Sequence, residues 1–303
     1  MGFDIREFEV TGEKKVRLSD FATEGGKDLN KKKTINESMP KNIAEMAQLQ
    51  EKLYAENQHA LLVVLQAMDA AGKDGTIRHV MTGLNPQGTQ VVSFKAPSSE
   101  EMDHDYLWRI SKALPRRGEI GIFNRSHYED VIVARVHDLV KGSQLPEELV
   151  TPDIWKKRYR QIRDFEQYLA ENGVKVVKIF LHVSKEEQRA RLLDRIRQPE
   201  KNWKFSSGDI DERRYWQQYQ EAYEHLLNST STPEAPWYVV PADKKWFARY
   251  LVSEIVLDAL KEIDPRYPEL SENEKGLLEE CRAILEADSE VKKEEQNVTA
   301  EKE

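Results

Sequence analysis

Cysteine is nearly absent from this chain of 303 residues, because Cys281 is the only one. A single thiol excludes intrachain disulfides and cysteine-based metal clusters, and its position in a late helical stretch favours a buried or bystander role over catalysis. Long apolar runs are absent as well: no segment approaches the ~18 apolar residues that a membrane helix needs, and the N-terminus has no apolar signal core. The sequence therefore predicts a cytoplasmic protein that does not contact membranes.

A surplus of basic residues is also missing. Lysine and arginine total 46 against 54 aspartates and glutamates, which gives a formal net charge of -8. This balance argues against a surface built to grip nucleic acid, so no nucleic-acid partner is expected. The seven histidines show no metal-binding spacing, which argues against a dedicated zinc site. The exception to the acidic average is the segment 189–204, which holds six basic residues against two acidic ones.

Five short apolar runs alternate with helical patterns along the middle of the chain. They are Leu61–Leu65, Gln90–Phe94, Ile120–Phe123, Val174–Val183 and Trp237–Val240. Continuous apolar runs are typical of strands covered on both faces, and their alternation with helices predicts an α/β fold with a doubly wound, five-stranded parallel sheet and helices on both faces. The clearest helix begins at Thr151-Pro152-Asp153 and ends before Gly173. In such sheets, ligands bind beyond the carboxyl ends of the strands.

The two ends of the chain differ from this middle part. Residues 1–42 have weak periodicity and include three consecutive lysines, so we expect an extended, poorly ordered arm that wraps the main body. Residues 266–303 are expected to form a helix and an acidic tail. This leaves one domain over residues 43–265, with a helical lid over about residues 189–215.

A loop of small residues follows the first apolar run and leads into a helix. Backbone N–H groups of such a loop and the dipole of the helix bind phosphate oxygens, and Lys73, where loop and helix meet, adds a mobile positive charge. The predicted phosphate-binding positions of the loop are Ala70, Ala71, Gly72, Asp74 and Gly75. The spacing matches G-x-x-x-x-G-K-[ST] with two departures: Ala67 replaces the first glycine, and Asp74 replaces the hydroxyl residue that would hold magnesium.

Asp69 lies inside this loop, where phosphate would repel a lone carboxylate. A bound Mg²⁺ would remove the repulsion, which makes Asp69 the candidate metal ligand. The alternative is that Asp69 and Asp74 only cap a tight turn between strand and helix. We favour phosphate binding, because capping leaves the run Gly72-Lys73-Asp74-Gly75 unexplained.

A second set of polar residues follows the third apolar run. Asn124 and Arg125 would face the same crevice as the phosphate loop, and an arginine can make two charge-assisted hydrogen bonds to one phosphate. Asn124 stands where ATPases usually place a metal-binding aspartate. Ser126 and Glu129 have the spacing of a capping box, so Glu129 belongs either to a helix cap or to the site. His127 is expected to pack rather than to catalyse.

The basic segment follows the fourth apolar run, where P-loop kinases carry a lid that closes over the phosphates. Arg191 and Arg195 lie four residues apart on one helical face, and Lys201 and Lys204 follow. The alternative is a charged face that only contacts solvent. We favour the lid, because so many basic residues gather in this one segment. Trp203 is expected to pack in the core or to stack on a base.

Several longer motifs occur in order between about residue 40 and residue 265. They are QAMDAAGKDG, GLNPQG, FKAPS, LPRRGEIGIFNRSHYE and PEKNWKFS. Together they resemble the family-2 polyphosphate kinases. The resemblance implies a P-loop kinase fold that transfers phosphoryl groups between inorganic polyphosphate and AMP, ADP or ATP, with guanine nucleotides as further candidates. It also implies Mg²⁺ as cofactor, with Mn²⁺ as a substitute, and a homo-oligomer.

The resemblance implies roles for individual residues as well. Asp69 resembles the family's metal- and phosphate-orienting acid, and Lys73 resembles its P-loop lysine. Arg125 matches the arginine after the second strand, and Arg195 matches a lid arginine. Asn124, where most of the family has aspartate, resembles the subgroup that accepts both AMP and ADP. Apart from the resemblance, Lys95 and Glu129 are predicted nucleotide-binding residues. Because the chain is acidic on average, a local basic track of Arg191, Arg195, Lys201 and Lys204 is predicted to contact polyphosphate.

The chemistry that the resemblance implies needs no strong general base, because the acceptor oxygen of AMP or ADP belongs to an already ionised phosphate. Catalysis then consists of positioning and of charge neutralisation by Mg²⁺, Lys73, Arg125 and Arg195. Each anhydride made resembles the one broken, so the reaction is expected to be freely reversible. Two alternatives stay open: an ATP-dependent kinase of the same fold, and a non-enzymatic nucleotide-binding protein.

Overall fold

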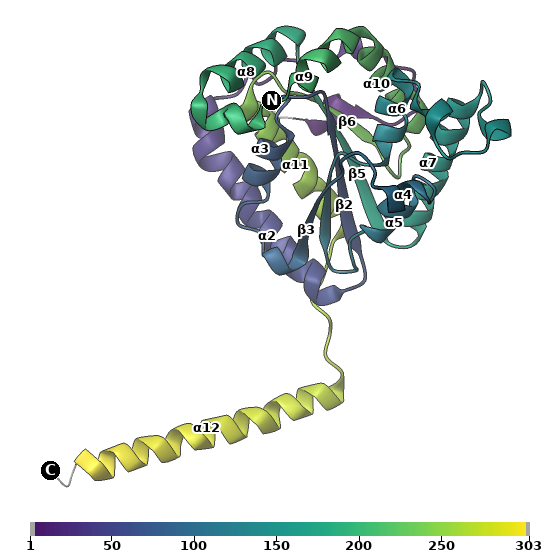
Figure 1. Ribbon diagram of the computed structural model, residues 1–303. Coiled ribbons are helices and arrows are strands. Elements are labelled where there is room, and N and C mark those ends of the chain that lie inside the picture. The colour runs from purple at the N-terminus through teal and green to yellow at the C-terminus, as the bar shows by residue number, and fades with distance from the viewer. Residues whose placement is uncertain (1–3, 301–303) are drawn as a thin grey trace. The chain divides into compact units, whose positions relative to one another are not determined.

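The computed structural model describes residues 4–300, and the side chains of residues 4–287. The chain divides into two compact units, Met1–Arg266 and Tyr267–Glu303. The first unit holds a twisted sheet with helices on both of its faces (Figure 1).

Six strands form the sheet, in the order β1-β6-β5-β2-β4-β3. Their bounds are β1 (Glu9–Val10), β2 (Ala60–Ala67), β3 (Thr89–Ser93), β4 (Ile120–Asn124), β5 (Val174–His182) and β6 (Trp237–Pro241). The strands from β6 to β3 pair in parallel, as the five apolar runs predicted, whereas β1 pairs with β6 in the antiparallel direction. The prediction of five strands is therefore wrong by one edge strand. With two residues, β1 is too short to show a periodic pattern.

The N-terminal arm is more ordered than predicted. Val10 and Leu18 are buried in the main core, and Ser231 holds the carbonyl of Val10 by a hydrogen bond. Helical structure begins before residue 43, with α1 (Lys31–Lys33) and a π-helical turn, η3 (Thr34–Ser38), that run into α2 (Met39–Glu56). The expectation of a poorly ordered arm over residues 1–42 is corrected, because apolar residues of the arm complete the core.

Helices cover both faces of the sheet, as predicted. The longer ones besides α2 are α3 (Lys73–Val80), α7 (Ile154–Glu171), α8 (Lys185–Arg197), α10 (Trp216–Thr230) and α11 (Lys245–Ile263). Helices α2, α3 and α11 pack together on one face, and α7 and α10 pack together on the other (Figure 1). The helix predicted after Thr151 is α7, and it ends before Gly173, whose φ of 83° breaks the helical path.

Short helical segments make up most of the connections. They are η1 (Ile5–Phe8), η2 (Leu18–Asp20), η4 (Pro86–Gly88), α4 (Ser99–Met102), α5 (Trp108–Lys112), η5 (His127–Asp130), α6 (Val133–Val136), η6 (Leu139–Gly142), η7 (Glu147–Leu149), η8 (Pro199–Lys204), α9 (Ser207–Glu212) and η9 (Arg213–Tyr215). The predicted lid segment 189–215 thus consists of most of α8, followed by η8, α9 and η9.

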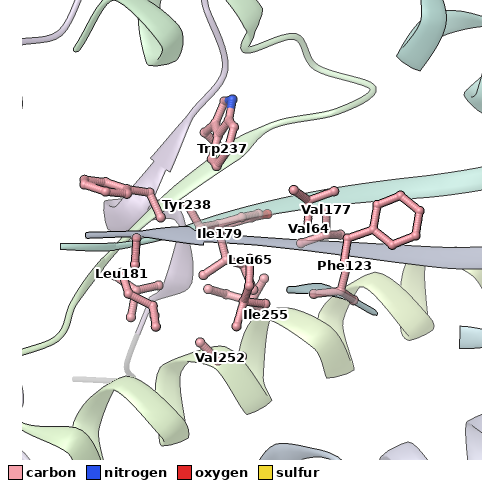
Figure 2. Packing of buried hydrophobic residues seen from close by; sticks show 14 of the residues in the cluster. Val64, Leu65, Phe123, Val177, Ile179, Leu181, Trp237, Tyr238, Val252 and Ile255 are labelled. Carbon is pink, nitrogen blue, oxygen red and sulfur yellow. The ribbon is translucent and has the colours of Figure 1, made fainter. Parts of the chain in front are cut away.

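The core lies between the central strands and α11. Figure 2 shows Val64 and Leu65 of β2, Phe123 of β4 and Ile255 of α11 among its residues. The run Leu61–Leu65 is buried on both faces of the sheet, which is why its side chains form one unbroken apolar series. Burial of each such side chain stabilises the fold by roughly 1.5–3 kcal/mol. The carboxyl ends of β2 and β4 therefore form a rigid base for the loops that follow them.

The second unit contains α12 (Glu272–Ala300), a helix in the region where one was expected. Leu277, Leu278 and Ile284 are exposed on it, and Cys281 is exposed too, so of its two expected roles only that of a bystander fits. Residues 301–303 of the predicted acidic tail lie outside the described residues. Among the helices that the structure describes, none combines the length and the apolar character needed to cross a bilayer.

Candidate active site

The carboxyl ends of β2 and β4 place two functional segments side by side. In this parallel pair, Leu65 of β2 lies opposite Asn124, the last residue of β4. The loop 68–72 continues from β2 and the segment 125–129 continues from β4, so both begin at the same edge of the sheet. The chain crosses from one side of β2 to the other between β4 and β5, which is the kind of position where doubly wound sheets bind ligands.

Two residues at this edge hold a left-handed backbone conformation although they carry side chains. Ala70, in the loop after β2, has a φ of 60°, and Arg125, directly after β4, has a φ of 64°. Gly72, with a φ of 111°, is the N-cap of α3. Left-handed backbone at residues other than glycine costs about 1–3 kcal/mol and is concentrated at functional sites. Such a loop can turn successive N–H groups toward one anion.

Lys73 lies against the loop and is shielded from solvent. Its Nζ donates a hydrogen bond of 2.9 Å to the carbonyl of Ala67. Burial lowers the pKa of Lys73, and the guanidinium of Arg125 lowers it further, while Asp69 and Glu129 oppose the shift. A phosphate in the loop would supply the anion that this buried ammonium needs.

Arg125 connects the two segments through a pair of carboxylates. Its Nη2 lies 2.7 Å from Oδ1 of Asp69, and its Nη1 lies 3.1 Å from Oε2 of Glu129. Burial alone would lower the pKa of Arg125, but the two carboxylates raise it above its ordinary value. Ser126 is the N-cap of η5, since its Oγ accepts from the N–H of Tyr128, but the reciprocal bond of a capping box does not form, because Glu129 binds Arg125. Of the two alternatives for Glu129, the geometry supports the site.

Asp74, the residue that replaces the hydroxyl of the phosphate-loop motif, pairs with Asn124. Nδ2 of Asn124 donates a hydrogen bond of 2.9 Å to Oδ1 of Asp74 and thereby joins the first turn of α3 to the tip of β4. The N-cap of α3 is Gly72, which has no side chain, so the alternative in which Asp69 and Asp74 only cap the turn does not fit. Lys95 lies just beyond β3 with an exposed side chain.

Arg191 of α8 does not have the predicted role of contacting polyphosphate. The residue is 7% exposed, and its Nη1 donates to the carbonyls of Ala70 and Ala71 at 3.2 and 2.6 Å. Its Nη2 donates to two carbonyls after β6 at 2.6 and 3.0 Å, and its Nε donates to Glu187 at 2.7 Å. All five N–H groups of the guanidinium are therefore in use. Arg191 fixes the shape of the phosphate loop and has no donor left for a substrate.

The other basic residues predicted for the lid pair with groups of the protein itself. Arg195 Nη1 lies 2.9 Å from Asp209, and Lys201 Nζ lies 2.6 Å from an aspartate of α8. Lys204 lies over the ring of Trp203, with 4.9 Å from its Nζ to the ring centre. Trp203 is 78% exposed, so the expectation that it packs in the core is wrong.

Lys73, Arg125 and Arg195 belong to one electrostatic cluster. Asp209, the ion-pair partner of Arg195, senses the charges of the other two. Burial and the nearby carboxylate of Asp69 raise the pKa of Asp209, and the three basic residues oppose the rise. Asp209 is therefore within electrostatic reach of all three cations.

Several residues around this region were missed by the sequence analysis. A small pocket beside Asp69 is also lined by Gln188, Glu212, Tyr219 and Tyr223. Gln188 donates a hydrogen bond of 3.1 Å to the carbonyl of Asp69, and its position on the buried face of α8 was the one available signal. The pocket has a volume of about 20 Å³, which is room for about one water. A nucleotide can enter only when the elements around the pocket move apart.

A larger groove of about 810 Å³ lies between the N-terminal arm and the start of α11. Half of its ten lining residues are basic, namely Lys27, Lys31, Lys244, Lys245 and Arg249, and we call it the basic groove. One of its lining residues, Arg249, lies near the start of α3, since a methyl group built on Gly75 would lie 3.4 Å from its Nη2. Burial lowers the pKa of Arg249, and the neighbouring Arg78 and Arg191 lower it further. A negatively charged ligand would relieve this repulsion.

No three histidine, cysteine, aspartate or glutamate side chains of the described residues come together as a ready metal site. Mg²⁺ does not require such a cage, because proteins usually hold it through one or two carboxylates and substrate phosphates. Asp69 lines the small pocket, and Asp74 offers a second carboxylate on the first turn of α3. This donor set fits a Mg²⁺ ion whose remaining ligands are phosphate oxygens and water.

Comparisons with known proteins agree with this geometry. The profile of the family Polyphosphate kinase 2 (PPK2) matches residues 29–268. A protein of Rhodopseudomonas palustris, named ADP-polyphosphate phosphotransferase, is 46% identical over 287 residues, which are 94% of this chain and 99% of that protein. An AMP/ADP-polyphosphate phosphotransferase of Meiothermus ruber is 51% identical over 271 residues, or 88% and 96% of the two chains. The crystal structure of polyphosphate kinase 2 from Arthrobacter aurescens has a TM-score of 0.80 and 40% identity, and the match covers 90% of this chain and 95% of that one.

Proposed function

Because the chain belongs to the polyphosphate kinase 2 family, we propose that it transfers phosphoryl groups reversibly between inorganic polyphosphate and AMP or ADP. The observation that carries the proposal is the bridge from Asp69 through Arg125 to Glu129, at 2.7 and 3.1 Å, beside the buried Lys73. Relatives named for this chemistry match nearly the whole chain. The bridge joins the loop after β2 to the segment after β4, so phosphates bound by these two segments would lie close together.

Two anions must approach each other in this reaction, so the protein has to supply positive charge at fixed positions. Lys73 and the N–H groups of the loop hold the phosphoryl group that is transferred. Arg125 exchanges its carboxylate partners for phosphate oxygens, and Arg195 does the same when it leaves Asp209. The reactants bring their own ionised oxygens, so no side chain needs to remove a proton, and the similarity of the two anhydrides makes the reaction reversible.

Asp69 and Asp74 would hold Mg²⁺, for which Mn²⁺ could substitute. When bound, the ion supplies positive charge between phosphate groups that would otherwise repel one another. The charge of the ion would also offset the repulsion between a bound phosphate and the carboxylate of Asp69, which lines the small pocket. Until substrate and metal bind, Arg125 neutralises this carboxylate at 2.7 Å.

The basic groove is the proposed path of the polyphosphate chain. Its residue Arg249 lies near the start of α3, which follows the phosphate loop, and its lysines come from the N-terminal arm and from the start of α11. A polyanion of several phosphates can contact these side chains one after another, which a single nucleotide cannot. The path replaces the predicted track through Arg191, because that side chain is buried and fully bonded.

The small pocket is the proposed place of the acceptor nucleotide. AMP and ADP are both proposed as acceptors, because Asn124 leaves the tip of β4 without the negative charge of an aspartate. The relative from Meiothermus ruber, 51% identical to this chain, carries both acceptors in its name. Guanine nucleotides are proposed as further acceptors, as the family resemblance implies.

The test is an assay of the purified protein with polyphosphate, Mg²⁺ and AMP, without ATP, repeated with ADP as the acceptor. We expect ADP from the first mixture and ATP from the second. In the reverse direction, ATP, Mg²⁺ and a short polyphosphate should give ADP and a longer polyphosphate. A control with pyrophosphate in place of polyphosphate separates use of the polymer from general anhydride transfer. Transfer from ATP but not from polyphosphate would favour the ATP-dependent kinase instead.

Two further expectations belong to the proposal. A homo-oligomer is proposed for the protein in solution, as the family resemblance implies, and light scattering of the purified chain measures it. The cytoplasm is proposed as its location, because AMP and ADP are metabolites of the cell interior. Fluorescence microscopy of a tagged chain tests the second expectation.

A further inference from the structure

A cluster of polar side chains lies wholly inside the protein, behind the segment that carries Arg125. It consists of Tyr128, Glu166 and Lys178, which are 0%, 2% and 0% exposed, with His127 at its border. The proposed reaction uses none of these groups. Because polar and charged groups are rarely buried without a function or a partner, the cluster requires an explanation.

Glu166 of α7 is the centre of the cluster. Its Oε1 accepts a hydrogen bond of 2.7 Å from the hydroxyl of Tyr128, and its Oε2 accepts one of 2.6 Å from Nζ of Lys178. Lys178 of β5 also donates to the carbonyl of Thr230 at the end of α10, at 2.6 Å. Nε2 of His127 lies 3.4 Å from Oε1. One carboxylate therefore ties a helix, a strand and the segment after β4 together.

A buried ion pair is a poor means of stabilising a fold. Removing two charges from water costs free energy that their attraction repays only in part, and apolar replacements of similar volume are often as stable or more stable. Burial alone would raise the pKa of Glu166, but Lys178 and His127 hold it below its ordinary value. The carboxylate is thus ionised at neutral pH. The cluster therefore has a role besides stabilising the fold, and that role concerns the segment of the chain that it holds in place.

The cluster holds the segment whose first residue is Arg125. Backbone strain at Arg125, with its φ of 64°, requires the following residues to be fixed, because otherwise the segment would relax. The backbone N–H of Arg125 is bound to Leu65, and three residues later the side chain of Tyr128 is bound to Glu166. The ring of Tyr128 also packs edge-on against Trp237 of β6, with 4.8 Å between the ring centres. These anchors fix the backbone on both sides of Arg125 and thereby the direction in which its side chain extends.

We propose that Glu166 is a positioning residue: through the hydroxyl of Tyr128 it fixes the segment after β4 and so aims Arg125 at the reacting phosphates. The inference rests on the proposed function only for the identity of the reaction. Its structural part, that Glu166 holds Arg125 in one orientation, does not depend on the substrate.

The first test uses two variants that remove the anchor in different ways. Tyr128→Phe deletes only the hydroxyl, and Glu166→Leu with Lys178→Met replaces the ion pair by apolar side chains of similar volume. We expect kcat to fall about 10- to 100-fold in both, as for a small misplacement of a catalytic group. The KM values for AMP and polyphosphate should change less than about threefold. Tyr159→Phe is the matched control, because it removes the hydroxyl of another buried tyrosine, which accepts a hydrogen bond of 2.9 Å from Arg135 outside the cluster.

The second test reads the orientation of Arg125 without any substrate. In the unaltered protein, its two carboxylate partners should slow rotation of the guanidinium, so that NMR resolves its Nη–H signals, assigned through Arg125→Lys. We expect these signals to average in Tyr128→Phe and to stay resolved in Tyr159→Phe. Resolved signals in Tyr128→Phe together with an unchanged kcat would overturn the inference. If the unaltered protein does not use polyphosphate, the proposed function fails, but the NMR comparison still decides whether Glu166 positions Arg125.

Discussion

Lys73 and Arg125 are charged side chains held in place before any substrate arrives, and their loss should be felt mainly in kcat. Lys73→Ala and Arg125→Ala should each lower kcat by roughly two to four powers of ten, the scale of losing preorganised charge stabilisation. Steady-state kinetics with AMP and polyphosphate measure the effect. Lys112→Ala, which removes a lysine that lies over Trp108 at 4.0 Å, is the control. Activity within threefold of the original protein in both site variants would contradict the assignment.

The pH profile should carry the signature of Lys73. A phosphate binds the protonated ammonium, so on the alkaline side kcat/KM should fall as the pH rises through the pKa of Lys73 in the free enzyme. Because burial and Arg125 lower this pKa from 10.5, the fall should begin at a lower pH than for an ordinary lysine. Burial raises the pKa of the pocket tyrosines Tyr219 and Tyr223, so they do not titrate in this range. In Lys73→Arg the fall should disappear, since arginine stays protonated, and an unchanged profile would contradict the prediction.

The pair of Asp74 and Asn124 permits a reciprocal test. Asn124→Asp replaces a hydrogen bond of 2.9 Å by two facing carboxylates, so without metal it should destabilise the protein by roughly 1 kcal/mol. Adding Mg²⁺ should restore part of the loss. Asp74→Asn combined with Asn124→Asp exchanges the two partners and should return the thermal midpoint to near its original value. A double variant as unstable as the single one would show that the hydrogen bond is not what joins the residues.

At the scale of elements, α8 acts as a support for the phosphate loop. Arg191→Met would leave the carbonyls of Ala70 and Ala71 without their donor, so we expect a loss of roughly 1–3 kcal/mol in the free energy of unfolding. Chemical denaturation measures it. Arg189→Met is the matched control, because Arg189 is exposed on the same helix, and its loss should stay within about 0.5 kcal/mol. Equal losses of unfolding free energy in the two variants would show that the hydrogen bonds of Arg191 stabilise the protein no more than an exposed arginine does.

The elements also show which parts of the fold were accessible from sequence. The five parallel strands were predicted from their apolar runs. Four of them are apolar because helices cover both faces of the sheet there, as in Leu61–Leu65, whereas the edge strand β3 is partly exposed. The strand β1 was not, because its place is decided by pairing with Trp237 and Tyr238, far away in the chain. The same holds for the helical turn before α2: its residues are polar except for Ile35, which is exposed, so they give no amphipathic pattern.

At the scale of the whole molecule, the net charge and the basic groove have opposite signs. A protein of charge -8 repels polyphosphate at a distance, so the proposed path depends on local positive charge, which the lysines and Arg249 of the groove supply. Changing Lys27, Lys31 and Lys244 to glutamine should raise the KM for long polyphosphate more than for short chains, and should weaken the dependence of KM on salt. Changing three lysines outside the groove, Lys14, Lys15 and Lys52, is the control for net charge. Equal effects on long and short chains would exclude the groove as the path.

The sequence by itself determined the central strands, the phosphate loop with Lys73, and the candidate Arg125, because each depends on residues that are neighbours along the chain. Spacing and residue type are enough to predict a loop whose backbone is suited to binding a phosphate. The tertiary structure alone decided that Glu129 binds Arg125 instead of capping a helix, and that Arg191 supports the loop instead of reaching for substrate. It also brought the arm to the basic groove and Glu166 to Tyr128. Such contacts join residues that are distant in sequence. The residue type of a long charged side chain is also the same whether its partner is water, a substrate or the protein's own backbone, so the sequence does not reveal the partner.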